Sequence, residues 1–191
     1  MQYKIIGQTV PVVEVTLNKG ETMYTQTGGM SYQTDGITMK TNARGGLMKG
    51  IGRMFSGESL FIANFTAERD GAMVAFGTTV PGNIMPVDLS QMPNGLTVQK
   101  GSFLCAEDSI ETSVTFSKKF SAGLVGGEGF ILQKAKGNGM LFLEVDGDPI
   151  EKELMPGEVL KVDTGNVVAF EQTVSYEVEM VKGIGNIFLG G

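Results

Sequence analysis

The chain alternates short stretches of apolar and β-branched residues with clusters of glycine, asparagine and aspartate. Period-two alternation or a compact apolar run, typical of a β-strand, occurs at residues 12–17, 73–77, 140–145 and 175–181. Turn residues at 93–95 (Pro-Asn-Gly) and 146–148 (Asp-Gly-Asp) predict hairpins. A helical period occurs in one doubtful stretch, residues 40–57. We therefore predict an all-β fold with little helix.

Two sequence elements recur along the chain. LNKGETMYTQTGG begins at Leu17 and LMPGEVLKVDTGN at Leu154, so that Gly20-Glu21 matches Gly157-Glu158. A weaker copy has Gly101-Ser102 at the Gly-Glu position. These matches predict a duplicated β-sandwich in one compact domain, residues 1–191, with units at about 1–95, 96–153 and 154–191.

The second recurring element is a Gly-Glu pair before an apolar strand, found at Gly57-Glu58 and Gly127-Glu128. Ser59 follows the first pair, whereas Gly129 takes the matching position in the second. If the element served catalysis, the second copy would also need the serine nucleophile, and it has none. We therefore interpret the Gly-Glu pair as a structural turn. The final IFLGG resembles the start of a third such element, which predicts an incomplete last unit; a simple tail is the alternative.

Composition supports a β fold and narrows the function. Glycine contributes 28 of 191 residues and proline only 6, a balance typical of many turns between strands. The net charge of −6 argues against a general nucleic-acid binder. One cysteine, no apolar leader and no long apolar run predict a cytoplasmic protein without a membrane-spanning helix.

The chain contains no histidine, which removes the commonest general base and metal ligand. Cys105 lies in a strand-like run, and we interpret it as a small core residue rather than a catalytic thiol. Acidic pairs at 107–108 and 151/153 lack the spacing of a calcium loop. We therefore predict no enzyme activity, no metal site and no cofactor.

Residues 40–57 stand out because they carry basic side chains and no acidic one. A basic, amphipathic segment of this kind could meet a membrane surface or an acidic partner. Its glycines disfavour a helix, so a loop packed on its own sandwich or on a neighbouring subunit is the alternative. The candidate interaction residues are Lys40, Arg44, Leu47, Lys49, Ile51, Arg53 and Phe55.

These elements together resemble the family of bacterial and mitochondrial proteins named after altered inheritance of mitochondria. The resemblance rests on a Ser-Gly-Glu-Ser-Leu-Phe element at 56–61, a Gly-Gly-Glu-Gly element at 126–129 and a Leu-x-Pro-Gly-Glu turn at 154–158. It implies a fold similar to the tryptophan RNA-binding attenuator protein, with duplicated sandwich or double-stranded β-helix units that tend to form oligomers.

We expect a non-enzymatic, homo-oligomeric scaffold or binding protein, cytoplasmic or peripheral at a membrane. An anionic membrane surface or an acidic protein is the expected partner of the basic segment. The alternative, by fold analogy alone, is a ring that binds a ligand or RNA. The balance of 15 Lys and Arg against 21 Asp and Glu counts against RNA.

Overall fold

The computed structural model describes residues 1–26, 28–43, 61–118 and 129–179. Within these ranges the chain forms β-strands joined by turns and by the short 3-10 turns η2 (Leu89–Gln91), η3 (Lys100–Ser102) and η4 (Thr164–Asn166). The strands are β1 (Gln2–Ile6), β2 (Val12–Leu17), β3 (Thr22–Thr25), β4 (Met30–Gln33), β5 (Ile37–Ala43), β6 (Phe61–Ala67), β7 (Ala72–Gly77), β8 (Gly82–Asp88), β9 (Leu96–Gln99), β10 (Phe103–Glu107), β11 (Glu111–Lys118), β12 (Phe130–Lys136), β13 (Met140–Asp146) and β14 (Ala169–Glu171). The all-β prediction is confirmed.

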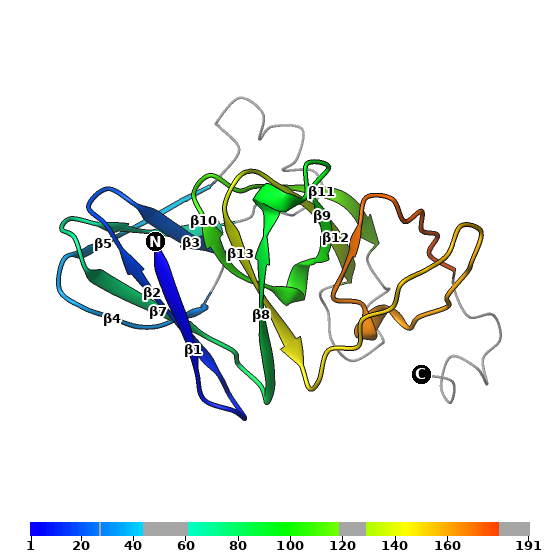
Figure 1. The fold of residues 1–191 in the computed structure, drawn as a ribbon, viewed down its shortest axis with the longest axis horizontal. Coiled ribbons are helices and arrows are strands. Elements are labelled where there is room, and N and C mark those ends of the chain that lie inside the picture. The colour runs from blue at the N-terminus through cyan, green and yellow to red at the C-terminus, as the bar shows by residue number, and fades with distance from the viewer. Residues whose placement is uncertain (27, 44–60, 119–128, 180–191) are drawn as a thin grey trace.

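Three antiparallel sheets make up the fold. The first has the strand order β1-β2-β7-β4, the second β5-β6-β3-β10-β13-β8, and the third β11-β12-β9-β14. Figure 1 shows β1, β2, β4 and β7 at one side of the molecule, β8, β10 and β13 in the centre, and β9, β11 and β12 beyond them. The six-stranded second sheet therefore forms the middle layer.

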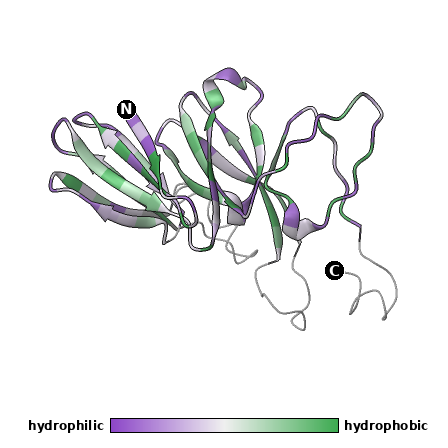
Figure 2. Cartoon of the chain, turned by 60° about the horizontal axis from the view of Figure 1, so that its bottom comes forward, coloured by the Kyte–Doolittle hydropathy of each residue, from purple (hydrophilic) through white to green (hydrophobic). Residues whose placement is uncertain are grey.

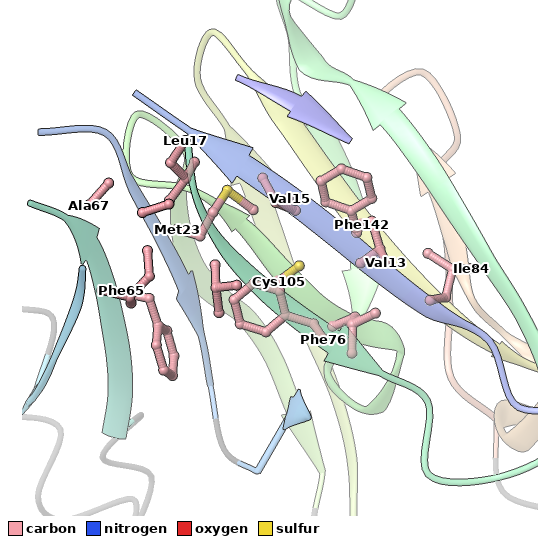
Figure 3. Packing of buried hydrophobic residues seen from close by; sticks show 14 residues of the cluster. Val13, Val15, Leu17, Met23, Phe65, Ala67, Phe76, Ile84, Cys105 and Phe142 are labelled. Atoms are coloured by element: carbon pink, nitrogen blue, oxygen red, sulfur yellow. The ribbon is translucent and has the colours of Figure 1, made fainter. Parts of the chain in front are cut away.

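The central strands of the middle sheet, β3, β10 and β13, are buried on both faces. Met23 and Phe142 pack into a first core cluster with Val13 and Val15 of β2 (Figure 3). Their neighbours Tyr24 and Leu141 pack into a second cluster with Val98 of the third sheet. Because successive side chains of a strand point to opposite faces, a sheet covered on both sides needs apolar residues at successive positions. The run MLFLEV of β13 has this pattern.

A β-bulge sets the packing of β10. The register against β13 shifts between Phe103 and Cys105, which pair with Leu143 and Phe142. Leu104 and Cys105, although adjacent, both belong to the first cluster. The extra residue of a bulge breaks the strict alternation of the strand and explains this.

Some expected elements differ from the structure. β2, β7 and β13 lie where the sequence predicted strands. The turn at 93–95 joins β8 to β9, which belong to different sheets, so it is not a hairpin. Residues after Gly147 do not pair with β13, and the described part of 175–181 forms no strand. An apolar pattern needs a neighbouring strand to become a ladder, and the described chain offers none there. The predicted repeat limits remain a prediction.

We expect Phe142→Ala to lower the free energy of unfolding by roughly 3–5 kcal/mol, because it leaves a large cavity in a packed core. Phe142 is 0% exposed and its ring meets Tyr3 edge to face at 5.0 Å. Urea unfolding measures this loss as a lower urea concentration at the unfolding midpoint, with the m-value unchanged.

Met39→Ala serves as the matched control, because Met39 lies on β5 of the same sheet but is 54% exposed. Its effect should stay within about 0.5 kcal/mol. Equal losses in the two variants would contradict the two-sided burial of the middle sheet.

Candidate interaction surface

The structure describes only the first four residues of the basic segment, 40–43, which form the end of β5. Lys40 is exposed on β5, an edge strand of the middle sheet, and its carbonyl oxygen accepts a hydrogen bond from Asn64 Nδ2 at 3.4 Å. The other predicted residues, Arg44, Leu47, Lys49, Ile51, Arg53, Phe55, Gly57, Glu58, Gly127 and Glu128, lie outside the described residues. No helix in the described ranges is long and apolar enough to cross a membrane.

A second surface lies after β13. We call residues 150–163 the apolar arm, which projects beside the third sheet (Figure 1). No residue of the arm belongs to a strand. Hydrophobic positions are spaced along this part of the chain (Figure 2). Exposed side chains of the arm are Ile150 at 82%, Met155 at 66%, Val159 at 81%, Leu160 at 50% and Val162 at 48%.

The arm turns through a Gly-Glu motif. Gly157 has φ +84°, and the N–H of Glu158 donates to the carbonyl oxygen of Met155 at 2.9 Å. The Glu158 carboxylate accepts from the N–H of Met155 at 3.0 Å, which closes the turn. The positive φ explains the glycine, because other residues are strained in that region.

The first copy of the motif has the same geometry. Gly20 has φ +87°, the N–H of Glu21 donates to Asn18 O at 3.0 Å, and Glu21 Oε2 accepts from the N–H of Asn18 at 2.8 Å. The surroundings differ, since Leu17 and Met23 beside this turn are 1% and 0% exposed. The arm therefore has the local structure of a sandwich element without its cover.

The weaker copy does not share this turn. Gly101 and Ser102 lie in η3, where Ser102 N–H donates to Gln99 Oε1 at 3.2 Å. The predicted match at this position is wrong, because a side chain preceding the 3-10 turn, rather than a following glutamate, caps the backbone.

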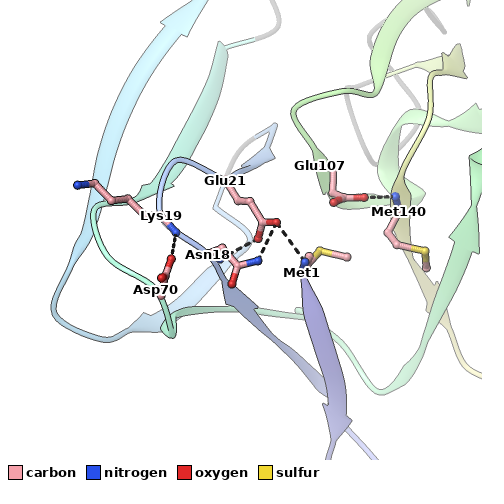
Figure 4. A network of polar contacts seen from close by, with 7 residues as sticks. All are labelled: Met1, Asn18, Lys19, Glu21, Asp70, Glu107 and Met140. Carbon is pink, nitrogen blue, oxygen red and sulfur yellow. Dashed lines mark hydrogen bonds and ion pairs between the residues drawn. The ribbon is translucent and has the colours of Figure 1, made fainter.

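An acidic depression lies between β3 and β10 and includes the acidic pair 107–108. Its volume is about 240 Å³, and Glu21, Glu107 and Asp108 contribute to its lining. Glu21 also binds the amino group of Met1 at 3.2 Å, and Glu107 Oε2 accepts from the N–H of Met140 at 2.6 Å (Figure 4). Two of its carboxylates are thus engaged in backbone or terminal contacts. Among the described residues, no three His, Cys, Asp or Glu side chains, those of the depression included, are grouped so that they could hold a metal ion.

Cys105 is fully buried, and burial raises the pKa of its thiol well above the usual value. A thiol that stays protonated among apolar side chains is a poor nucleophile. The core interpretation of Cys105 agrees with this placement.

Glu144 is a polar residue that the sequence analysis did not single out. It lies near the end of β13, half-buried, and accepts a hydrogen bond from the N–H of Thr79. Its Oε2 atom and Thr78 Oγ1 are buried without a hydrogen-bond partner among the described residues. Burial raises the pKa of Glu144, Asp146 adds to the shift, and the Thr79 N–H opposes it.

Glu144→Gln should stabilise the protein near pH 7. Because the folded-state pKa of Glu144 is raised, its contribution to stability falls as the pH rises through that pKa. Glutamine keeps an acceptor for Thr79 without the buried charge. The advantage should disappear below about pH 4, where glutamate is protonated in both states. Urea unfolding as a function of pH measures it.

Glu14→Gln is the control with the opposite sign. The pKa of Glu14 is lowered by the hydrogen bonds that its carboxylate accepts from the Lys4 ammonium and from the Tyr32 hydroxyl. This carboxylate stabilises the fold above its unfolded pKa, and the contribution is lost as the pH falls through the folded one. The variant should be less stable than wild type at pH 7 and equal to it in acid. The same sign for both variants would refute the assignment.

Comparison with known proteins places the chain in a family. An uncharacterized protein of Streptococcus pyogenes serotype M6, M6_Spy0233, is 31% identical over 181 residues, which cover 91% of this chain and 71% of that protein. The crystal structure of SPYM3_0169 from Streptococcus pyogenes has a similar fold, with a TM-score of 0.75 and 28% identity over 99% of this chain and 85% of that one.

The family model described as Mitochondrial biogenesis AIM24 matches residues 3–191. The match extends over nearly the whole chain and includes all three sheets. It agrees with the resemblance seen in the Gly-Glu elements of the sequence. The chain therefore belongs to the AIM24 family.

Proposed function

We propose that the protein is a non-enzymatic β scaffold that assembles with copies of itself and presents its basic segment to an acidic surface. The exposed apolar arm carries the first half of this proposal. Five large hydrophobic side chains of the arm face solvent at 48–82% of their surface. Fully burying one such side chain contributes about 1.5–3 kcal/mol, so covering the arm would favour association.

The arm is suited to contact a β-structured partner. Its backbone forms no strand ladder, whereas the equivalent turn at Gly20 leads into β3, which pairs on both sides. Unpaired edges and apolar faces together are the features through which β proteins associate. A second copy of this chain is a suitable partner, because it is always present at the same concentration as the arm that it would cover.

Two features support a non-enzymatic role. The chain has no histidine. The acidic side chains that gather in the depression near β3 bind backbone N–H groups or the terminal amine, as Glu21 and Glu107 do. Groups engaged in this way stabilise turns rather than transfer protons.

The second half of the proposal concerns residues 40–57. Lys40, Arg44, Lys49 and Arg53 give this segment four positive charges in a chain of net charge −6. Attraction to anionic lipid is worth about 1 kcal/mol per basic residue close to the surface. The protein would act in the cytoplasm and bind weakly to a membrane surface, or to an acidic protein. A ring that binds a ligand or RNA remains the alternative function, supported by fold analogy alone.

We expect native mass spectrometry and sedimentation velocity at micromolar concentration to show a homo-oligomer. Val159→Lys combined with Leu160→Lys should shift it toward the monomer, because charge in the arm prevents apolar contact. Val10→Lys is the control, since Val10 is 48% exposed in the turn between β1 and β2. A wild-type monomer under these conditions would refute assembly.

Liposome co-sedimentation tests the basic segment. Vesicles with anionic lipid should bind the protein at low salt and release it at high salt. Changing Lys40, Arg44, Lys49 and Arg53 to Gln should abolish binding, whereas changing Lys152 and Lys161 of the arm should not. Binding indifferent to salt and to the four substitutions would exclude the membrane, and capture by an acidic protein would then be the remaining form of the proposal.

A further inference from the structure

The middle sheet consists of two three-stranded halves, each with a counterpart elsewhere. Its half β8-β13-β10 has the same connectivity as β2-β7-β4 of the first sheet. Its half β5-β6-β3 has the same connectivity as β11-β12-β9 of the third sheet. Each set of six successive strands thus places one half in one sheet and its other half in the next.

A shared irregularity supports this equivalence. The register of β4 on β7 shifts between Met30 and Tyr32, which pair with Phe76 and Ala75. The register of β10 on β13 shifts at the matching place, between Phe103 and Cys105. Bulges are specific features rather than random defects, so two at one position favour a true repeat.

A side-chain contact found in both units fixes which residues correspond. Thr34, directly after β4, accepts a hydrogen bond from the N–H of Met73 on its Oγ1 at 2.9 Å. Glu107, at the end of β10, accepts from the N–H of Met140 on its Oε2 at 2.6 Å. Thr34 therefore corresponds to Glu107, and Gln33 to Ala106.

One strand pair joins successive units. β3 of the first unit pairs with β10 of the second, and β9 of the second unit pairs with β14, which follows the arm. This assignment puts the units at about 12–77 and 82–146, with the third beginning after 147, and so moves the limits expected from the sequence. In each case the strand after the first turn of one unit pairs with the strand at the third position of the next.

Two ends of this series have no partner in the described chain. Residues 159–162 follow the Gly157-Glu158 turn as β3 follows Gly20-Glu21, so they correspond to β3. They form no ladder, and Val159, Leu160 and Val162 are exposed. β4 is the third strand of the first unit, and it ends its sheet with all four residues exposed.

We propose that residues 159–162 of one copy pair antiparallel with β4 of a second copy, so that copies join head to tail. The inference rests on the proposed assembly and names its interface. The register follows from β3 and β10, where Tyr24 pairs with Ala106 and Met23 with Glu107. Lys161 is then opposite Gln33 of the second copy, and Leu160 opposite Thr34.

This contact satisfies two exposed features at once. It covers the free hydrogen-bonding edge of β4 and gives the apolar arm a sheet to join, the mode known as β-augmentation. Because donor and acceptor are different surfaces, each copy uses both and the interface is heterologous. Such contacts produce closed rings or open chains rather than closed dimers.

Disulfide cross-linking of Gln33→Cys/Lys161→Cys tests the register. Directly opposite residues of antiparallel strands have Cβ atoms about 4.5–5.5 Å apart, near the disulfide range. Mild oxidation should give a ladder of covalent dimers, trimers and larger species. Each single variant can form at most a covalent dimer, since Cys105 is buried. Gln2→Cys/Lys161→Cys is the matched control, because Gln2 is exposed on the free edge of β1.

The outcomes separate this inference from the proposed function. A wild-type oligomer whose Gln33→Cys/Lys161→Cys variant links no better than the control would refute the interface and leave assembly intact. A link within one chain, found by mass spectrometry of the monomer band, would show that the arm pairs with its own β4 and would also refute the inference. A wild type that is monomeric would refute the proposed assembly itself.

Discussion

The fold depends on covering both faces of the six-stranded middle sheet. Met23 and Tyr24 are adjacent in β3, fully buried, and belong to different core clusters. One sheet therefore supplies the inner wall of two sandwiches, and neither cluster could form if β10 or β13 were displaced. Because interiors are packed without voids, this shared wall couples the first and third sheets although they do not pair.

The same need for a covering sheet explains why the apolar side chains of the arm are exposed. Its turn has the geometry of the Gly20 turn, yet the residues around it are exposed because no sheet of the described residues covers them. Local rules fix the turn, since Gly157 supplies the positive φ and Glu158 binds the N–H of Met155. Whether the residues beside the turn are buried depends instead on the strands that pack against them. Among the described residues this unit therefore has the local turn geometry of the first unit and no covering sheet.

Sequence patterns predicted what depends on adjacent residues. Alternation identified β2, and the Gly-Glu match identified two turns that share a conformation. The patterns could not show whether a strand finds a partner. EVLKVD of the arm reads like a half-buried strand and is exposed, and the turn at 93–95 crosses between sheets. The partly buried carboxylate of Glu144 has no signal in the sequence, because only tertiary packing buries it. The predicted interaction segment beyond residue 43 lies outside the described residues.

The two proposed contacts differ in their physical basis, which keeps them separable. The arm carries exposed apolar side chains together with charges of both signs, and its Lys161 lies 3.9 Å from Glu179, further along the chain. Association through the arm should therefore depend little on salt. The segment that begins at Lys40 has only positive charge, and attraction between exposed charges weakens as the Debye length shortens. Head-to-tail assembly would also place many basic segments on one particle. Several weak contacts on a linked array bind far more tightly than one, so assembly through β4 and the arm would turn a marginal attachment into a stable one.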